Sequence, residues 1–163
     1  MIYVALGANV PSQAGPPAVT LRRALALMPR HGIQVHAVSP LYRSVAWPNP
    51  ADPPFVNAVV EVKARLLPGE LLKALLAIEK AFGRVRKRAN EPRTLDLDLI
   101  DYGGLVSDAE QLMLPHPRMH ERAFVLRPLA DIAPAWRHPD TGEGILALLR
   151  NVGEAGLERL EDA

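Results

Sequence analysis

Four segments of the chain carry the pattern of β-strands. Apolar residues there alternate with polar ones or form short continuous runs, which is typical of strands that bury one face or both. The pattern predicts strands over residues 2–6, 33–45, 55–62 and 92–100. We expect the second strand to be irregular near Pro40, because proline cannot donate a hydrogen bond to a neighbouring strand.

Other segments carry the pattern of helices. Apolar residues recur at helical spacing and predict amphipathic helices over residues 17–28 and 68–82. Residues 112–134 should mix short helical and extended pieces, and residues 145–152 should form a short helix. The tail after Gly156 is expected to be held only weakly.

The order of these elements predicts the fold class. Strand, helix, strand, strand, helix, strand is the order of the split βαβ arrangement. We therefore expect an α+β fold, a ferredoxin-like βαββαβ sandwich with a mostly antiparallel sheet and helices packed on it. The helices should cover one face of the sheet and leave the other face, or an edge, for ligands. At 163 residues, the chain 1–163 is expected to form a single domain.

Composition narrows the class of protein without identifying it. A net charge of +1 gives no global electrostatic case for binding nucleic acid or membranes. No apolar run approaches the roughly 18 residues that span a bilayer, and the N-terminus lacks the features of a signal peptide. The absence of cysteine excludes disulfides, thiolate metal sites and cysteine nucleophiles. It is compatible with a cytoplasmic location, which we expect.

Asp96 and Asp98 are the most informative pair of polar residues, because they lie inside a predicted buried strand. Side chains two residues apart on a strand point to the same side, with Cα atoms roughly 6–7 Å apart. The leucines beside them should therefore face the opposite side. Charged pairs in a sheet need a neutralising partner. Mg²⁺ provides one, since it takes oxygen ligands from one or two carboxylates and from phosphate. A solvated acidic pair bound to arginines is the alternative.

Just before this strand the sequence gathers positive charge. Five cations fall within ten residues: Arg84, Arg86, Lys87, Arg88 and Arg93. The segment is either a solvated turn or a binding site for an anion, since only one acidic residue lies within it. A polyphosphate fits, and a nucleic-acid backbone fits less well with a single loop and little net charge. Carboxylates that bind metal beside a cationic loop are the parts that phosphoryl transfer needs.

A second polar motif, HPRMHER, occupies residues 116–122 and holds two histidines four residues apart. This spacing can bind zinc on a helix, but Pro117 interferes with a helix and the chain has no thiolate. We favour a His116 imidazole that contacts phosphate, with Arg122 beside it. A loop histidine bonded to a backbone carbonyl is the alternative.

Three further residues each have two interpretations, and a fourth, Glu79, has one. Asn57 either satisfies backbone groups at the start of a strand or reads the edge of a heterocycle through its donor and acceptor. Phe55 and Phe124 either belong to the core or stack on a flat ring. Glu79 lies on a partly buried side of its helix, where a salt bridge to an arginine is the simplest interpretation.

Taken together, these motifs resemble one family. The segments ALGAN at 5–9, Pro53-x-Phe55-x-Asn57, GRVRKRANEPRTLDLDLI at 83–100 and LPHPRMHERAFVLRPL at 114–129 are similar to the 6-hydroxymethyl-7,8-dihydropterin pyrophosphokinase family of folate biosynthesis. The resemblance covers roughly residues 1–140, in the family's order. It implies that ATP gives its terminal diphosphate to the hydroxymethyl group of the pterin, with release of AMP.

By position, the resemblance also implies roles for individual residues. Asp96 and Asp98 are expected to bind two Mg²⁺ ions that hold the triphosphate. Arg84 and Arg93 are expected to steady the diphosphate as it moves. The expected ATP-binding residues are Glu79, Arg86, His116 and Arg122. The expected pterin-binding residues are Ser44, Val45, Phe55, Asn57 and Phe124.

Two other functions are compatible with the same residues. A nucleotidyltransferase or nuclease also uses an Asp-x-Asp strand with Mg²⁺, and AMP formed only when a pterin alcohol is present would distinguish the pyrophosphokinase. A small RNA-binding module would bind RNA in a salt-dependent manner without turning over ATP. The expected partners are the small-molecule substrates, ATP and 6-hydroxymethyl-7,8-dihydropterin. The chain is expected to be a monomer that binds neither nucleic acid nor membrane.

Overall fold

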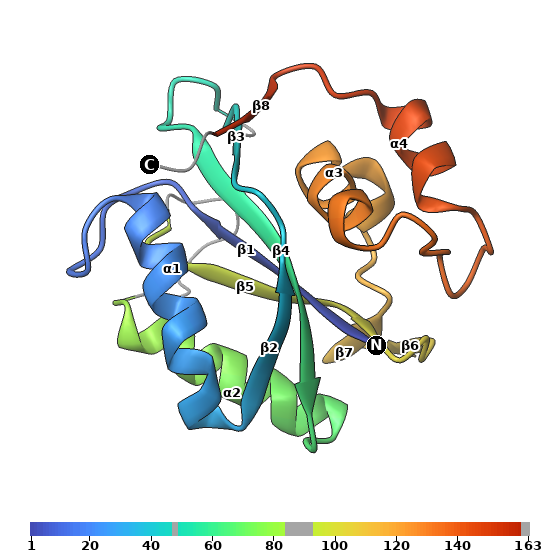
Figure 1. Ribbon diagram of the computed structural model, residues 1–163, viewed down its shortest axis with the longest axis horizontal. Coiled ribbons are helices and arrows are strands. Elements are labelled where there is room, and N and C mark those ends of the chain that lie inside the picture. The colour runs from blue at the N-terminus through green and yellow to red at the C-terminus, as the bar shows by residue number, and fades with distance from the viewer. Residues whose placement is uncertain (47–48, 84–92, 161–163) are drawn as a thin grey trace.

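The computed structural model describes residues 1–46, 49–83 and 93–160. Its centre is an antiparallel sheet with helices on both faces (Figure 1). The strands run β5–β1–β4–β3–β8 across the sheet, and β2 pairs with another part of β4. In chain order these strands are β1 (Ile2–Ala8), β2 (Ile33–Val38), β3 (Tyr42–Ser44), β4 (Phe55–Ala64), β5 (Asp96–Tyr102) and β8 (Leu157–Arg159).

The predicted βαββαβ order is confirmed. The helix α1 (Pro17–Leu27), which continues into the short 3₁₀ helix η1 (Met28–His31), joins β1 to β2. The helix α2 (Pro68–Ala81) joins β4 to β5. The strands that each helix joins are not neighbours: β4 lies between β1 and β2, and β1 lies between β4 and β5, so every neighbouring pair is antiparallel.

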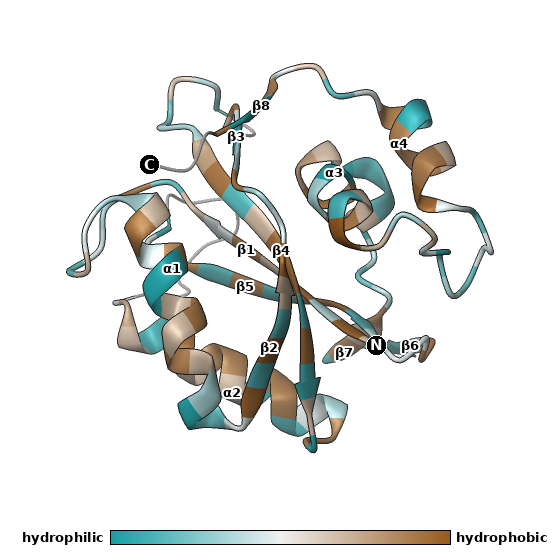
Figure 2. Cartoon of the chain, in the orientation of Figure 1, coloured by the Kyte–Doolittle hydropathy of each residue, from teal (hydrophilic) through white to brown (hydrophobic). Residues whose placement is uncertain are grey.

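One face of the sheet packs on α1 and α2 in the main hydrophobic core. Leu21 of α1 and Leu71 and Leu75 of α2 are fully buried there. Leu97 and Leu99 of β5 belong to the same core, which confirms that the leucines of this strand face away from its two aspartates. Figure 2 shows the resulting alternation of hydrophobic and hydrophilic residues along β5.

The expectation that the other face stays open is wrong in part. The helices α3 (Ala123–Ile132) and α4 (Ile145–Val152) lie on that face (Figure 1), because each carries an apolar stripe that must be buried. Trp136, between them, is buried and donates through Nε1 to Asp101 Oδ2 of β5 at 2.9 Å. This leaves one end of the face, near Gly7, for a binding site.

The strand predicted over residues 33–45 is divided into β2 and β3, which both pair with β4. Ser39 bridges the break: its hydroxyl accepts the backbone N–H of Val59 at 2.9 Å, and its own N–H donates to the Val59 carbonyl at 3.0 Å. The irregularity near Pro40 is therefore a complete break between two strands.

The expectation of a weakly held tail is wrong for the residues that the structure describes. β8 pairs with β3 along its whole length, and the Leu160 N–H donates to the Leu41 carbonyl at 2.9 Å. The remaining elements are a small hairpin of β6 (Ser107–Ala109) and β7 (Leu112–Leu114), and a 3₁₀ helix, η2 (Met119–Glu121), before α3. Within the described residues, every helix is too short or too polar to cross a bilayer.

Candidate active site

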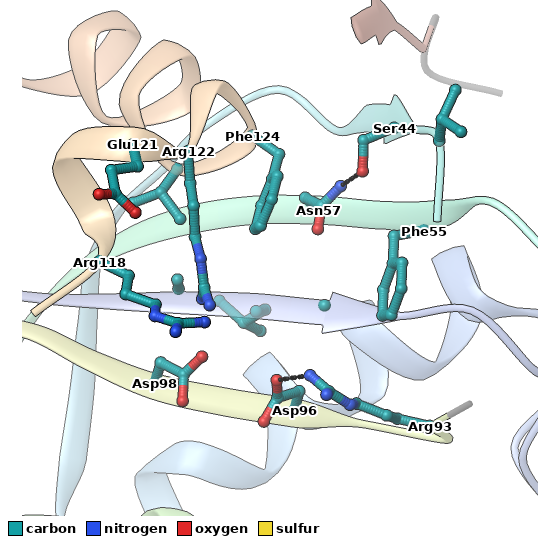
Figure 3. Close-up of a pocket in the computed structure, with 15 residues that line it drawn as sticks. Ser44, Phe55, Asn57, Arg93, Asp96, Asp98, Arg118, Glu121, Arg122 and Phe124 are labelled. Atoms are coloured by element: carbon teal, nitrogen blue, oxygen red, sulfur yellow. Dashed lines mark hydrogen bonds and ion pairs between the residues drawn. The ribbon is translucent and has the colours of Figure 1, made fainter. Parts of the chain in front are cut away.

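A cavity of about 430 Å³ opens at the free end of the sheet, between the ends of four strands and the start of α3. The sheet provides its floor, and the segment from η2 into α3 provides the facing wall (Figure 3). Small residues of β1 make the space, since Ala5 and Gly7 lie in register with Asp98 and Asp96 of β5. The lining residues are Ala5, Leu6, Gly7, Ser44, Val45, Phe55, Asn57, Arg93, Asp96, Asp98, Arg118, Glu121, Arg122, Phe124 and Val125.

The two aspartates point into this cavity from the edge strand β5, as the strand alternation predicts (Figure 3). Asp96 Oδ2 accepts a hydrogen bond from Arg93 Nη1 at 2.7 Å, within an ion pair that is mostly buried. Side chains of Arg118 and Arg122 reach toward Asp98 from the facing wall (Figure 3). The carboxylates therefore lie among guanidinium groups, which limits the cost of placing two negative charges side by side.

Arg93 is held by its backbone as well as by its side chain. Its N–H donates to Asn9 Oδ1 at 2.7 Å, and its carbonyl accepts the Asn9 N–H at 3.0 Å. Asn9 is buried and also donates through Nδ2 to the Pro53 carbonyl at 3.1 Å. This asparagine therefore joins the end of β1 to the segment before β5 and fixes where Arg93 enters the cavity.

On the facing wall, Arg122 lies with its guanidinium carbon 5.7 Å from the centre of the Phe124 ring. Burial lowers the pKa of Arg122, and the negative charge of Asp98 opposes that shift. His116 accepts the Arg118 N–H at its Nδ1, at 3.2 Å. Burial, helped by the charge of Arg122, lowers the pKa of His116 to about 4, so the imidazole is neutral at physiological pH.

Asn57 provides the polar group at the other end of the cavity. It is 4% exposed, and its Nδ2 donates to the Ser44 hydroxyl at 2.8 Å (Figure 3). A Cβ at Gly7 would lie only 3.3 Å from Asn57 Oδ1, so the absence of a side chain at Gly7 leaves room for the amide. One end of the amide is thus fixed by Ser44, and its remaining groups are available to the cavity.

Phe55 and Phe124 flank the space in front of Asn57 (Figure 3). Phe55 comes from the start of β4, and Phe124 from the first turn of α3. Both are only partly buried, which is unusual for phenylalanines that serve the core. An amide with a phenyl ring on either side can hold a flat heterocycle by stacking and by edge hydrogen bonds.

The structure brings most of the predicted site residues together. Nine of them line the cavity: Ser44, Val45, Phe55, Asn57, Arg93, Asp96, Asp98, Arg122 and Phe124. His116 and Glu79 do not line it, and Glu79 is buried at 2% exposure behind β5. Arg84 and Arg86 lie outside the described residues.

Arg118 and Glu121 line the cavity, and the sequence analysis did not select them. Both belong to the HPRMHER motif, but the turn between His116 and α3 follows neither helical nor strand periodicity. Their direction was therefore not predictable from spacing. Arg118 adds a third guanidinium to those of Arg93 and Arg122, and its position between two predicted phosphate contacts was the available signal.

Comparison with known proteins gives one consistent result. Residues 3–134 match the model of the family described as 7,8-dihydro-6-hydroxymethylpterin-pyrophosphokinase. The chain is 45% identical over 150 residues to the 2-amino-4-hydroxy-6-hydroxymethyldihydropteridine pyrophosphokinase of a Synechocystis species, covering 91% of this chain and 74% of that one. It is 44% identical over 164 residues to the protein of the same name from Pseudomonas aeruginosa, covering 99% and 98%.

Solved structures agree on the fold. A crystal structure described as HPPK-DHPS in complex with substrates has a TM-score of 0.73 at 12% identity, over 99% of this chain and 46% of that one. A Plasmodium falciparum HPPK-DHPS triple mutant also gives 0.73, at 15% identity, over 97% and 47%. This chain therefore spans just under half of those longer chains. By its family match and its full-length relatives, the chain belongs to the 7,8-dihydro-6-hydroxymethylpterin pyrophosphokinase family, ATP-dependent enzymes of folate biosynthesis.

Proposed function

We propose that the cavity described above is where this chain carries out the reaction of its family. In that reaction the terminal diphosphate of ATP is transferred to the hydroxymethyl group of 6-hydroxymethyl-7,8-dihydropterin, and AMP is released. The observation that carries the proposal is the division of one cavity into two ends. Asp96 and Asp98 lie among arginines at one end, and Asn57 lies between two phenyl rings at the other.

The aromatic end fits the pterin. A pterin is flat and carries hydrogen-bond donors and acceptors along one edge, which matches an amide between two rings. Asn57 would bind that edge, while Phe55 and Phe124 stack on its two faces. Ser44 and Val45, at the end of β3, line the same part of the cavity and can offer backbone groups to the pterin.

The acidic end fits the metal that phosphoryl transfer requires. Asp96 and Asp98 offer hard oxygen ligands from the same face of one strand, which suits two Mg²⁺ ions shared with the triphosphate. In the described part of the chain no third acidic or histidine side chain completes a metal cluster, so phosphate and water would supply the other ligands. When bound, Mg²⁺ neutralises charge on the phosphates as they are transferred.

The arginines fit the phosphates. Arg93 and Arg122 approach the carboxylates from opposite sides of the cavity, and guanidinium groups pair well with phosphate oxygens. Arg93 would exchange its contact with Asp96 for a phosphate once that carboxylate binds metal. Transfer requires alignment and charge neutralisation more than covalent help, and these residues provide both. Arg84 and Arg86 are proposed as further phosphate contacts from the resemblance alone.

The two predicted ATP contacts that lie outside the lining act more indirectly in this proposal. His116 is neutral and sits next to Arg118 and Arg122, so it can accept or donate a hydrogen bond without adding charge. Glu79 holds the backbone of β5 from behind and would affect ATP through the carboxylates that this strand carries.

We further propose that residues 1–163 act as one domain, as a monomer and in the cytoplasm. The full-length match to the Pseudomonas aeruginosa protein supports a single domain, because that relative has the pyrophosphokinase name alone. The two small-molecule substrates are the proposed partners, without nucleic acid or membrane.

The test is a reaction with ATP, Mg²⁺ and 6-hydroxymethyl-7,8-dihydropterin, followed by chromatography of the nucleotides. We expect AMP and the pterin diphosphate in equal amounts, and no AMP when the pterin is omitted. Release of AMP at the same rate without pterin would instead indicate a hydrolase or nucleotidyltransferase. A protein that forms no AMP with both substrates would contradict the proposal.

A further inference from the structure

The space between Phe124 on one side and Phe55 and Asn57 on the other is called the pterin slot. A hydrogen bond far from the reacting groups links the two walls of this slot. The Tyr42 hydroxyl of β3 donates to Asp131 Oδ2 near the end of α3. Tyr42 is 6% exposed and Asp131 is exposed, so the bond is partly buried. Burial, followed by its contact with Asp131, raises the pKa of Tyr42 to about 12, so the hydroxyl keeps its proton at physiological pH.

Asp131 is itself held in place by α3 and by the chain after α4. Its Oδ1 accepts a hydrogen bond from Arg127 Nη2 at 2.9 Å, one turn earlier on the helix. Arg127 Nη1 lies 3.9 Å from Glu154 Oε1, in the segment that leads to β8. The carboxylate therefore has a fixed orientation, and Tyr42 docks against a pre-organised acceptor.

Tyr42 is connected to the slot through its own strand. It pairs with Asn57 of β4 across the ladder, and Ser44 lies two residues further along on the same side of β3. Ser44 is the residue that fixes the Asn57 amide. Since β3 has only three residues, a side-chain anchor at Tyr42 constrains the position of Ser44 directly.

Asp131 is connected to the slot through its helix. It lies seven residues after Phe124, which is close to two turns, so both side chains project from the same side of α3. One wall of the slot is thus Phe124 on α3, and the other is formed by Phe55 and Asn57 on the sheet. The Tyr42 contact joins these two bodies directly.

We propose that Tyr42 and Asp131 are positioning residues that set the separation between Phe124 and Asn57, and so determine how tightly the slot holds a pterin. This inference rests on the proposed assignment of the slot to the pterin. Neither residue lines the cavity, so both act through Ser44, Asn57 and Phe124.

The test compares two tyrosines that each lose one hydroxyl. Tyr42→Phe removes the hydrogen bond to Asp131. Tyr102→Phe removes a hydrogen bond to the Leu66 carbonyl, and neither Tyr102 nor Leu66 lines the cavity. Dissociation constants for 6-hydroxymethyl-7,8-dihydropterin and for a nonhydrolysable ATP analogue are measured by calorimetry, with Tm from thermal unfolding. We expect Tyr42→Phe to weaken pterin binding roughly three- to tenfold, as the loss of one partly buried hydrogen bond allows.

ATP-analogue binding should stay within about twofold, and the pterin KM should rise more than kcat falls. Tyr102→Phe should lower Tm without changing the pterin constant. Asp131→Ala should weaken pterin binding, and adding Tyr42→Phe to it should cause little further loss. Unchanged pterin binding in Tyr42→Phe, or an equal loss for pterin and ATP, would overturn the inference. Failure of the unaltered protein to bind pterin would refute the proposed function instead.

Discussion

Glu79 Oε2 accepts a hydrogen bond from the backbone N–H of Leu97 at 2.7 Å, midway between the two aspartates of the site. Glu79 lies in α2, is 2% exposed and approaches β5 from the face opposite the cavity. β5 is an edge strand, so its backbone lacks a neighbouring strand on one side. A buried carboxylate therefore fixes the strand that carries Asp96 and Asp98. In this way α2 supports the site although its residues do not line the cavity.

We predict that Glu79→Ala destabilises the fold by roughly 1–3 kcal/mol, because it leaves a buried backbone N–H without its acceptor. Turnover should fall as well, since the strand that carries the carboxylates loses its support. Glu79→Gln keeps an acceptor oxygen and should lie between Glu79→Ala and the unaltered protein. Urea unfolding gives the free energy, and AMP formation gives kcat.

Glu70 offers a matched control in the same helix. Its Oε1 accepts the Leu67 N–H at 2.8 Å and caps the start of α2, nine residues before Glu79. Glu70→Ala should cost about 1 kcal/mol of stability with kcat unchanged. If Glu79→Ala lost stability while kcat stayed at the level of Glu70→Ala, Glu79 would be a packing residue only.

Replacing Asp98 tests the acidic end of the cavity. Asp98→Asn keeps the size of the side chain and removes the negative charge that Mg²⁺ needs, so kcat should fall by at least about a hundredfold. Asp108→Asn, an equivalent change at an exposed position of β6, should leave turnover unchanged. We would compare initial rates of AMP formation and use circular dichroism to confirm that both variants fold. Similar rates for the two variants would refute the metal role of Asp98.

Removing the metal should affect the two ends of the cavity differently. With EDTA in excess, AMP formation should stop and return when Mg²⁺ is restored. Pterin binding by itself should persist with little change, because Ser44 and not a carboxylate holds the Asn57 amide. Calorimetry of the pterin with and without EDTA measures this. A pterin that dissociates on chelation would mean that the metal also organises the aromatic end.

The sequence predicted those parts of the fold and site that depend on regular spacing. The alternation of leucine and aspartate in β5 predicted which side chains face the core and which face the cavity, and both predictions are confirmed. The apolar stripe of α2 predicted its length, because a surface helix must bury one face. The shared direction of Phe55 and Asn57 likewise follows from their spacing on β4.

The parts that the sequence did not predict depend on contacts between distant segments. β8 has three residues and no pattern of its own, so only its pairing with β3 makes it a strand. The second sheet face is covered by α3 and by the segment after it, where Trp136 donates a hydrogen bond to Asp101. Spacing along the chain does not predict that contact. Glu79 was predicted near ATP, but a helical pattern does not reveal that it accepts a hydrogen bond from the Leu97 N–H.

The low pKa of His116 leads to a prediction about stability and pH. In the folded protein its pKa is about 4, against 6.5 for an ordinary histidine, chiefly because it is buried and secondly because Arg122 lies close by. Between these two values the unfolded chain takes up a proton at this residue and the folded protein does not. The free energy of unfolding should therefore be highest above about pH 6.5 and should decrease as the pH falls toward 4.

His116→Gln cannot take up this proton, so it should flatten the pH dependence in that window, by at most about 3 kcal/mol at its lower end. Some dependence should remain, because burial also lowers the pKa of His138. Urea unfolding from pH 7 to pH 4 without nucleotide measures the effect. His31→Gln, at the end of η1 and away from the cavity, is the control and should follow the unaltered protein. Parallel curves for His116→Gln and the unaltered protein would show that His116 titrates alike in both states, and that its imidazole is not held neutral by the fold.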